Sequence, residues 1–97
     1  MAVTAFLDLH LREDALAEAP AVIAATLKDT RAFDGCQGIE VLQDVADPAH
    51  LTVVERWESL QHDDAYRAWR ATPEGANELG ALTGGRIALT RYEPTTI

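Results

Sequence analysis

Hydrophobic and polar side chains alternate in four segments of the chain, and this period of two predicts a strand in each. The first strand has one wholly apolar face, made of Val3, Ala5, Leu7, Leu9 and Leu11. Its opposite face carries Thr4, Phe6, Asp8 and His10. The other three strands are expected at residues 38–45, 51–58 and 86–93. Residues 46–50 form a short, turn-rich connection, so the second and third strands should pair antiparallel.

A period near 3.6 residues predicts a helix after the first strand. Its buried stripe consists of Leu16, Ala19, Ile23, Leu27 and Thr30. Pro20 has no backbone N–H, so we place it in the first turn, where no helical hydrogen bond is lost. Asp34 and Gly35 have the chemistry of a turn and end this segment.

A second helix is expected after Ser59, a residue type that caps helix N-termini well. Its buried stripe is predicted to be His62, Ala65, Tyr66 and Trp69. The solvent side would then carry Asp63, Asp64, Arg67 and Arg70. Asp63 and Arg67 are spaced for an ion pair along the helix.

The order of elements, including a further helix that begins at Thr72 and ends at Gly84, is βαββαβ. This order predicts an α+β, ferredoxin-like fold, in which a four-stranded antiparallel sheet has helices on one face. The opposite face, with Phe6 and His10, would have no covering element in the chain. Exposed aromatic sheet faces usually have a partner, and a second copy of the same sheet is the simplest one. We therefore expect a homodimer through the sheet faces.

Composition narrows the possible functions. The chain has 97 residues, with 16 acidic against 8 basic side chains and a formal net charge of −8. We expect one domain over residues 1–97, with no nucleic-acid partner and no membrane partner, because anionic partners require basic surfaces. The longest apolar run, residues 19–25, is too short to cross a bilayer, and no signal peptide is recognisable. One cysteine cannot form an internal disulfide, so a reduced, cytoplasmic protein is expected.

The sequence contains no motif for a bound cofactor. Glycine-rich phosphate loops are missing, and Cys36 has the surroundings of a packing residue rather than a nucleophile. Consecutive helical residues point about 100° apart, so His62 and the two aspartates after it cannot converge on one metal ion. His10 and His50 have no partner at ligand spacing, and His50 is expected in a solvated turn. We therefore expect no metal, flavin or haem.

A ligand pocket is expected between the third strand and the helix that follows it. Glu55 and Trp57 share one strand face, and the facing helix stripe carries His62, Tyr66 and Trp69. An aromatic wall with a few polar groups is typical of small-molecule sites. Glu55 and His62 would transfer protons, because burial of the carboxyl would raise its pKa. In the alternative interpretation the rings are ordinary core, and Glu55 pairs with an arginine or reaches the sheet edge.

Several stretches of the chain resemble the antibiotic biosynthesis monooxygenase family of the dimeric α+β barrel superfamily. They are residues 34–42 (DGCQGIEVL), the Asp47-Pro48 turn, residues 53–59 (VVERWES) and Ala65-Tyr66. The resemblance implies a homodimer whose two sheets close into a barrel, with a pocket in each protomer between sheet and helices. It also implies oxidation of an aromatic, quinol or polyketide-type substrate by O₂ without metal, flavin or haem.

The resemblance also implies roles for individual residues. Trp57 matches the family's pocket tryptophan, and Tyr66 resembles its pocket tyrosine. Val53 stands where polyketide oxygenases have an asparagine. Leu7 and Leu79 stand where the haem-degrading branch has an asparagine and a histidine, so haem binding is not expected. The expected catalytic residues are Trp57, Glu55 and His62, and the expected substrate pocket comprises Leu7, Val53, Tyr66, Trp69 and Leu79.

The sequence thus predicts a cofactor-independent monooxygenase that oxidises a small aromatic, quinol or polyketide-type compound. The alternative is a non-oxygenase on the same dimeric barrel, either an isomerase or a small-molecule binding protein. A non-catalytic dimeric module is a third possibility. Convergence of Glu55, His62 and Tyr66 on Trp57 would favour an enzyme, because these groups would supply its acid–base chemistry.

Overall fold

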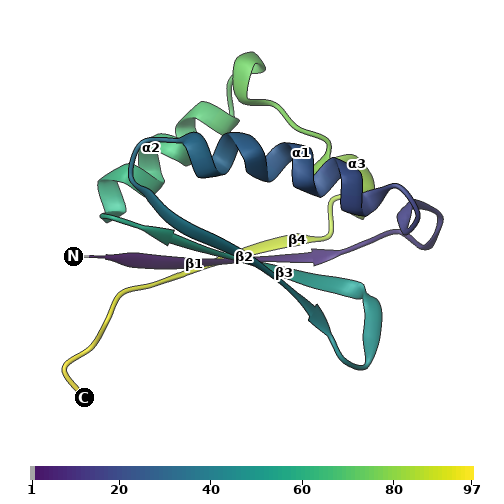
Figure 1. Cartoon of the computed structure of the whole chain (residues 1–97), viewed down its shortest axis with the longest axis horizontal. Helices are drawn as coiled ribbons and strands as arrows, with labels where there is room; N and C mark the ends of the chain where they lie inside the picture. The colour runs from purple at the N-terminus through teal and green to yellow at the C-terminus, as the bar shows by residue number, and fades with distance from the viewer. Residues whose placement is uncertain (1) are drawn as a thin grey trace.

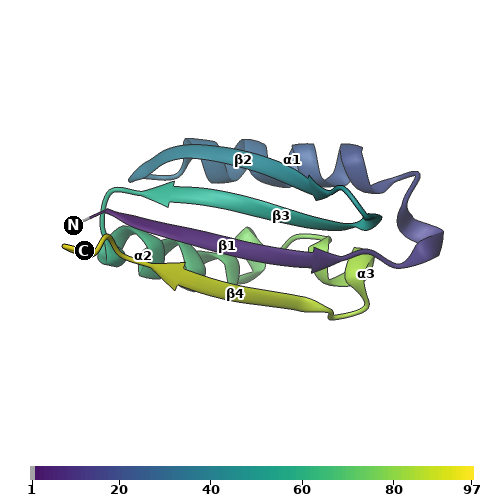
Figure 2. The same ribbon diagram turned by 90° about the horizontal axis from the view of Figure 1, so that it is seen from below.

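A four-stranded antiparallel sheet forms the centre of the protein in the computed structural model, which describes residues 2–97. The strands are β1 (Val3–His10), β2 (Cys36–Asp44), β3 (Asp47–Trp57) and β4 (Ile87–Tyr92). Their order across the sheet is β2-β3-β1-β4, so β3 and β1 are the two central strands. Figure 2 shows this order, with the helices behind the sheet.

The helices cover only one face of the sheet (Figure 1). They are α1 (Ala19–Ala32), α2 (Leu60–Arg70) and the short α3 (Leu79–Thr83), with 3₁₀ turns at Glu13–Ala15 and Pro73–Gly75. Helix α1 lies behind β2, whereas α2 and α3 lie behind β1 and β4 (Figure 2). The expected ferredoxin-like βαββαβ fold is therefore confirmed. None of the helices within residues 2–97 is long and apolar enough to span a membrane.

Local chemistry sets the helix ends. Pro20 lies in the first turn of α1, as predicted. The Ser59 hydroxyl accepts a hydrogen bond from the backbone N–H of His62 at 3.2 Å, which confirms the predicted cap of α2. Helix α3 ends at Gly84, whose φ of 60° is a left-handed conformation that glycine adopts without strain.

The turn between β2 and β3 is shorter than expected. Only Val45 and Ala46 lie between the strands, because Asp44 and Asp47 already pair across the turn. The Asp44 side chain accepts a hydrogen bond from the Ala46 backbone N–H at 2.8 Å, which stabilises the turn. The placement of His50 in a solvated turn is therefore wrong, since His50 lies within β3.

The single helix expected from Thr72 to Gly84 is two separate pieces. Ala76 has extended backbone angles, φ −62° and ψ 147°, which end the 3₁₀ turn. The Asn77 side chain then accepts a hydrogen bond from the Leu79 backbone N–H at 2.9 Å and starts α3. The segment between the end of α2 at Arg70 and the start of α3 at Leu79 is therefore not one continuous helix.

Two clusters of buried side chains fill the space between sheet and helices. The larger cluster is made of aliphatic side chains such as Leu9, Ile23, Leu27, Val53 and Leu82. The smaller cluster contains Val3, Ala5, Trp57 and Tyr66, with Phe33, Cys36 and Trp69 packed against it. Burial raises the pKa of the Cys36 thiol, as expected for a packing residue.

Helix α2 is rotated relative to the predicted orientation. Its buried residues are Asp63 and Tyr66, whereas Ala65 is exposed. The expectation that Asp63 lies on the solvent side is wrong, because its carboxylate forms ion pairs with Arg67 and Arg91 beneath the helix. The predicted Asp63–Arg67 pair is confirmed, but it is buried at its acidic end.

The uncovered face of the sheet, called the open face below, carries the side chains predicted for it. Phe6 packs edge-on against Tyr92, with ring centroids 5.3 Å apart. Asp8 accepts a hydrogen bond from Thr52 on the same face at 2.8 Å. Leu9, by contrast, is fully buried in the core on the helix side. The open face therefore has aromatic side chains at its centre and polar groups where β1 ends.

Candidate functional site

The aromatic residues expected to wall a pocket pack against one another. The rings of Trp57 and Tyr66 have centroids 4.8 Å apart, and those of Tyr66 and Trp69 are 6.2 Å apart. Phe33, at the end of α1, inserts between them at 5.3 Å from Tyr66 and 5.4 Å from Trp69. These four rings, the aromatic cluster, bridge α1, β3 and α2. Trp57 has no exposed surface.

Glu55 is buried and also paired with an arginine, so it combines two of the alternatives left open by the sequence. Only 1% of its surface is exposed. One carboxylate oxygen accepts hydrogen bonds from the Arg67 guanidinium and, at 3.2 Å, from Trp57 Nε1. A buried charge is tolerated when it is matched and hydrogen-bonded in this way.

The Glu55–Arg67 pair belongs to a larger buried network. Arg67 Nε lies 2.9 Å from Asp63 Oδ1 in an ion pair that is not aligned as a hydrogen bond. The other oxygen of Asp63 lies 3.5 Å from Arg91 on β4. Two carboxylates and two guanidinium groups thus connect β3, α2 and β4. The sequence did not indicate this network, because Arg67 and Asp63 were expected on the solvent side of the helix.

The Tyr66 hydroxyl forms hydrogen bonds with two side chains. It lies 2.6 Å from the Thr30 hydroxyl of α1 and accepts a hydrogen bond from Arg70 Nε at 2.7 Å. Arg70 also donates to the Thr26 carbonyl oxygen at 2.9 Å. These bonds hold α1 and α2 together, so the visible role of Tyr66 is to join the two helices.

His62 lies apart from the aromatic cluster. Its Nδ1 is 2.7 Å from the Ser59 hydroxyl, and its Nε2 is 3.5 Å from Glu58 and 3.8 Å from Asp34. None of these partners belongs to the aromatic cluster. The structure therefore brings Glu55, Trp57, Tyr66 and Trp69 together, but it does not bring His62 to Glu55.

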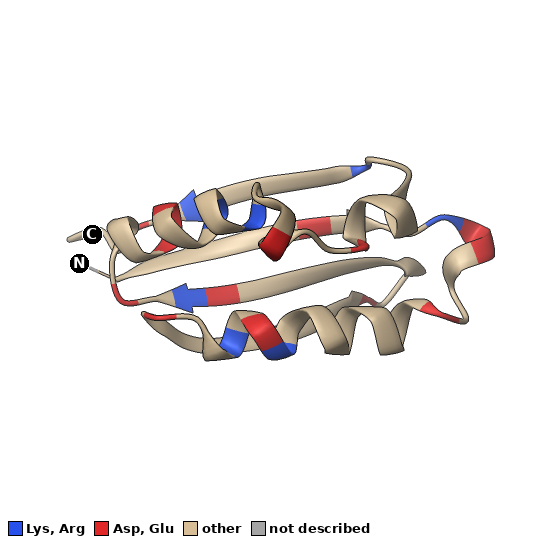
Figure 3. Cartoon of the chain, turned by 90° about the horizontal axis from the view of Figure 1, so that it is seen from above, with Lys and Arg blue, Asp and Glu red and all other residues tan. Residues whose placement is uncertain are grey.

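A cavity of about 360 Å³ lies elsewhere, between α1 and the β2–β3 edge of the sheet. Its walls are mainly aliphatic and include Leu11, Ile23, Leu27, Val41 and Leu51. Arg31 and Gln43 are the polar side chains among its lining residues. Figure 3 shows why the α1 wall is apolar, since the charged positions of α1 are confined to its C-terminal end. Residues 19–27 carry none.

The remaining expected pocket residues lie in the larger core cluster. Val53 has no exposed surface, Leu79 is 6% exposed, and Leu7 packs against the cluster from β1. None of the three lines the cavity. The sequence did not indicate the cavity, because its walls come from side chains that periodicity identifies only as core.

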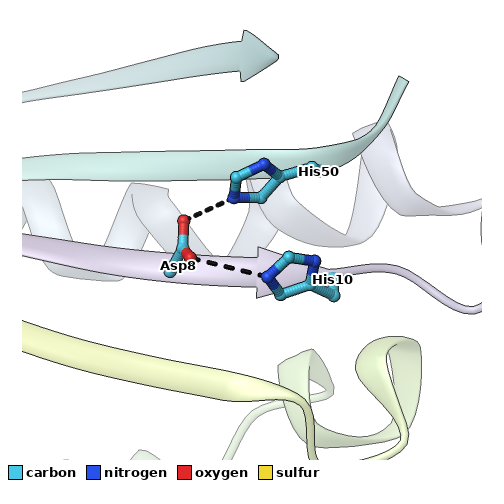
Figure 4. A group of neighbouring side chains, drawn as sticks. All are labelled: Asp8, His10 and His50. Atoms are coloured by element: carbon cyan, nitrogen blue, oxygen red, sulfur yellow. Dashed lines mark hydrogen bonds and ion pairs between the residues drawn. The ribbon is translucent and has the colours of Figure 1, made fainter. Parts of the chain in front are cut away.

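A polar cluster that the sequence did not indicate lies on the open face (Figure 4). His10 and His50 pair directly across β1 and β3, and their rings stack with centroids 4.3 Å apart. Asp8 contacts both imidazoles through its two oxygens. The expectation that the two histidines have no partner is therefore wrong. The β1–β3 register, which the sequence alone does not specify, places these residues next to one another.

Hydrogen bonds within this cluster shift the pKa values of Asp8, Asp44 and His50. His50 Nδ1 lies 2.9 Å from Asp44, and its Nε2 lies 2.7 Å from Asp8. The two carboxylates raise the pKa of the His50 imidazole above its ordinary value. Their bonds to His50 in turn lower the pKa of both Asp8 and Asp44.

The chain is similar to proteins of known fold over its whole length. A family model described as antibiotic biosynthesis monooxygenase matches residues 2–76. The structure of Rv0793 from Mycobacterium tuberculosis is 25% identical with a TM-score of 0.80, and the match covers 100% of this chain and 98% of that chain.

Two further solved structures share the fold at lower identity. A Deinococcus radiodurans protein, described as a candidate antibiotic biosynthesis monooxygenase, is 22% identical with a TM-score of 0.76 over 98% of this chain and 94% of its own. A conserved Methanosarcina mazei protein is 16% identical with a TM-score of 0.79 over 98% and 94%. No curated protein matches the chain by sequence.

Proposed function

Because the chain belongs to the antibiotic biosynthesis monooxygenase family, we propose that it is a cofactor-independent monooxygenase that oxidises a small aromatic, quinol or polyketide-type compound with O₂. The cavity between α1 and the β2–β3 edge carries this proposal. Its volume of about 360 Å³ and its mainly aliphatic walls suit a planar substrate of modest size.

Arg31 provides the electrostatic element of the proposed site. It lies in the last turn of α1 and lines the cavity. Within residues 2–97 it forms no ion pair with a carboxylate, so its charge is available to a ligand. A guanidinium beside a substrate hydroxyl favours the anion and lowers the pKa of that hydroxyl. The hydroxyl proton passes to water, and the electron-rich anion then passes an electron to O₂.

The proposed reaction needs no external reductant. When a methylene between two aromatic rings is oxidised, one oxygen atom becomes the new carbonyl oxygen. The other oxygen atom leaves as water with the two methylene hydrogens, so the substrate supplies every electron. With a quinol, one oxygen atom enters a ring C–H bond as a hydroxyl, and the other leaves as water with the two hydroxyl hydrogens of the quinol, which becomes a quinone. The protein positions the substrate, stabilises its anion and excludes bulk water.

Oxygen uptake with anthrone and with naphthohydroquinone tests this proposal. Arg31→Met keeps the apolar stem but removes the charge, so we expect kcat/KM to fall roughly 100-fold. Lys28→Met is the matched control, because it removes a cation from the same helix outside the cavity lining. Ala24→Trp places a large ring in the cavity wall and should raise KM. Unchanged kinetics in both Arg31→Met and Ala24→Trp would contradict the assignment of the cavity.

Glu55, Trp57 and His62 remain candidates for the reaction centre. Trp57→Phe removes the indole N–H and leaves a smaller ring at a buried position, whereas Glu55→Gln keeps the shape and removes the carboxylate charge. If either change abolishes turnover while circular dichroism shows an intact fold, the chemistry takes place at the aromatic cluster. His62→Gln tests the imidazole in the same way. Wild-type turnover in all three variants would leave the cavity as the site.

A non-oxygenase binding protein or isomerase is the second candidate. One observation favours it, since no carboxylate or imidazole lines the cavity within the described part of the chain. Such a protein would bind the quinol without consuming O₂. Calorimetric binding in the absence of oxygen uptake would therefore identify this alternative.

We also propose that the protein is a homodimer joined through the open face. Leu42 and Tyr92 are 47% and 54% exposed on this face, and Tyr92 packs against the partly buried Phe6. A second sheet packed on these side chains would bury them. The arrangement leaves the cavity accessible, because the cavity lies on the helix side of the sheet.

A further inference from the structure

Three potential metal ligands meet at one end of the open face (Figure 4). Asp8 and His10 extend from β1, and His50 extends from β3. One ligand atom from each lies within 4.8 Å of the other two. Asp8 Oδ1 is 2.7 Å from His50 Nε2, and Asp8 Oδ2 is 3.5 Å from His10 Nε2. Ligand atoms around a tetrahedral zinc ion are about 3.3 Å apart, so the three groups are already near coordination spacing.

Neighbouring side chains orient two of these ligands. Asp44 Oδ2 lies 2.9 Å from His50 Nδ1. A carboxylate at Nδ1 holds the proton on that nitrogen, an arrangement that recurs around metal-bound histidines, and a bound metal would replace the 2.7 Å contact of Nε2 with Asp8 Oδ1. The Thr52 hydroxyl donates to Asp8 Oδ1 at 2.8 Å and fixes the carboxylate. The cluster therefore has the supporting contacts of a metal site as well as its ligands.

The charges of the cluster also fit a divalent cation. Asp8 and Asp44 carry two negative charges, because their hydrogen bonds to His50 lower the pKa of both carboxyl groups. Within residues 2–97, no lysine or arginine forms an ion pair with either carboxylate, and histidines are their only ion-pair partners. A divalent ion would balance the two charges at the point where the His10 and His50 rings meet.

We propose that Asp8, His10 and His50 bind one divalent transition-metal ion per chain, through two imidazole Nε2 atoms and one carboxylate. Two nitrogen ligands favour zinc, cobalt, nickel or iron over calcium and magnesium, which prefer oxygen ligands. Three protein ligands leave at least one position open to water or another ligand. The His10 side chain is 47% exposed in the single chain.

This metal site is separate from the cavity of the proposed oxygenase. His10 and His50 are followed in the chain by Leu11 and Leu51, and both leucines line the cavity. Since successive strand residues point to opposite faces, the sheet itself lies between metal and substrate. The ion therefore adds a second function to the open face and takes no part in the proposed oxidation.

Titration of chelator-treated protein with Co²⁺ and with Zn²⁺ tests the proposal, by visible absorption for cobalt and calorimetry for zinc. Mildly alkaline buffer keeps His50 neutral, so that protons do not compete for Nε2. We expect one ion per chain. His10→Ala and His50→Ala should each weaken binding by roughly 100-fold, and Asp44→Asn by roughly 10-fold through loss of the orienting bond. Asp8→Asn keeps the shape of the ligand and should also weaken binding.

His62→Ala is the matched control. It removes an imidazole that also lies within 4.0 Å of two carboxylates, Asp34 and Glu58, on a different part of the surface. We expect unchanged affinity and stoichiometry in this variant. The proposal is overturned if the wild-type protein takes up no Co²⁺ or Zn²⁺, if His62→Ala removes the binding, or if His10→Ala and His50→Ala leave it intact. Circular dichroism of each variant verifies that the sheet remains folded.

Discussion

The two faces of the sheet use acidic side chains in opposite ways. On the helix-covered face, Glu55 and Asp63 are buried and matched by Arg67 and Arg91. On the open face, Asp8 and Asp44 are about one-third exposed, and their ion-pair partners are histidines. Arginine stays charged at any ordinary pH, whereas an imidazole can lose its proton as the pH rises. The carboxylate–arginine pairs on the helix-covered face therefore keep their charges, whereas the carboxylate–histidine pairs on the open face can exchange a proton for another cation.

This difference separates structural charge from functional charge. A buried carboxylate with a fixed guanidinium partner holds elements in register, as Glu55 does between β3 and α2. A partly exposed carboxylate between two imidazoles can change partner without exposing the core. The same strands, β1 and β3, therefore contribute to a fixed core on one side and to an adaptable polar cluster on the other.

We expect the largest effect from a substitution that disrupts the buried ion-pair network of Glu55, Asp63, Arg67 and Arg91. Asp63→Ala should lower the free energy of unfolding by about 3 kcal/mol, because the change removes one member of a buried ion-pair network. Asp64→Ala is the control at the next position. Asp64 also pairs with Arg91, but its side chain is 58% exposed, so the expected loss is below about 1 kcal/mol. Equal losses in urea unfolding of the two variants would show that burial does not distinguish these aspartates.

A smaller effect is expected at the centre of the open face. Phe6→Ala removes a ring that would pack between the two sheets of the proposed dimer, so the dissociation constant should rise roughly 10-fold or more. Sedimentation velocity over a range of concentrations measures this shift. Lys28→Ala, on the outer surface of α1, should leave the dissociation constant unchanged. A wild-type protein that sediments as a monomer at micromolar concentration would refute the dimer.

Local sequence patterns predicted much of the fold. The alternation in β1 identified both faces of the sheet, because every second side chain from Val3 onward is apolar and packs into the core. The Ser59 cap and the position of Pro20 followed from backbone hydrogen bonding alone. These features depend on a few adjacent residues, so they can be read without the tertiary structure.

The charged sites could not be predicted in the same way. Asp63 was expected on the solvent side, opposite the predicted buried stripe of its helix, and its ion pairs with Arg67 and with Arg91 on β4 explain its burial. His10 and His50 are far apart in the chain, and the β1–β3 register alone makes them neighbours. The cavity depends on how α1 packs over the sheet edge, which periodicity does not specify. In each case a long-range contact decides the role of the residue.

One crystal structure of the protein soaked with Co²⁺ and naphthohydroquinone tests most directly whether the two faces of the sheet have separate functions. We expect an anomalous cobalt peak about 2.1 Å from His10 Nε2, His50 Nε2 and an Asp8 oxygen. We also expect electron density for the quinol in the cavity beside Arg31, on the other side of the sheet. A cobalt peak at His62 with none at Asp8, or quinol density on the open face, would refute this separation.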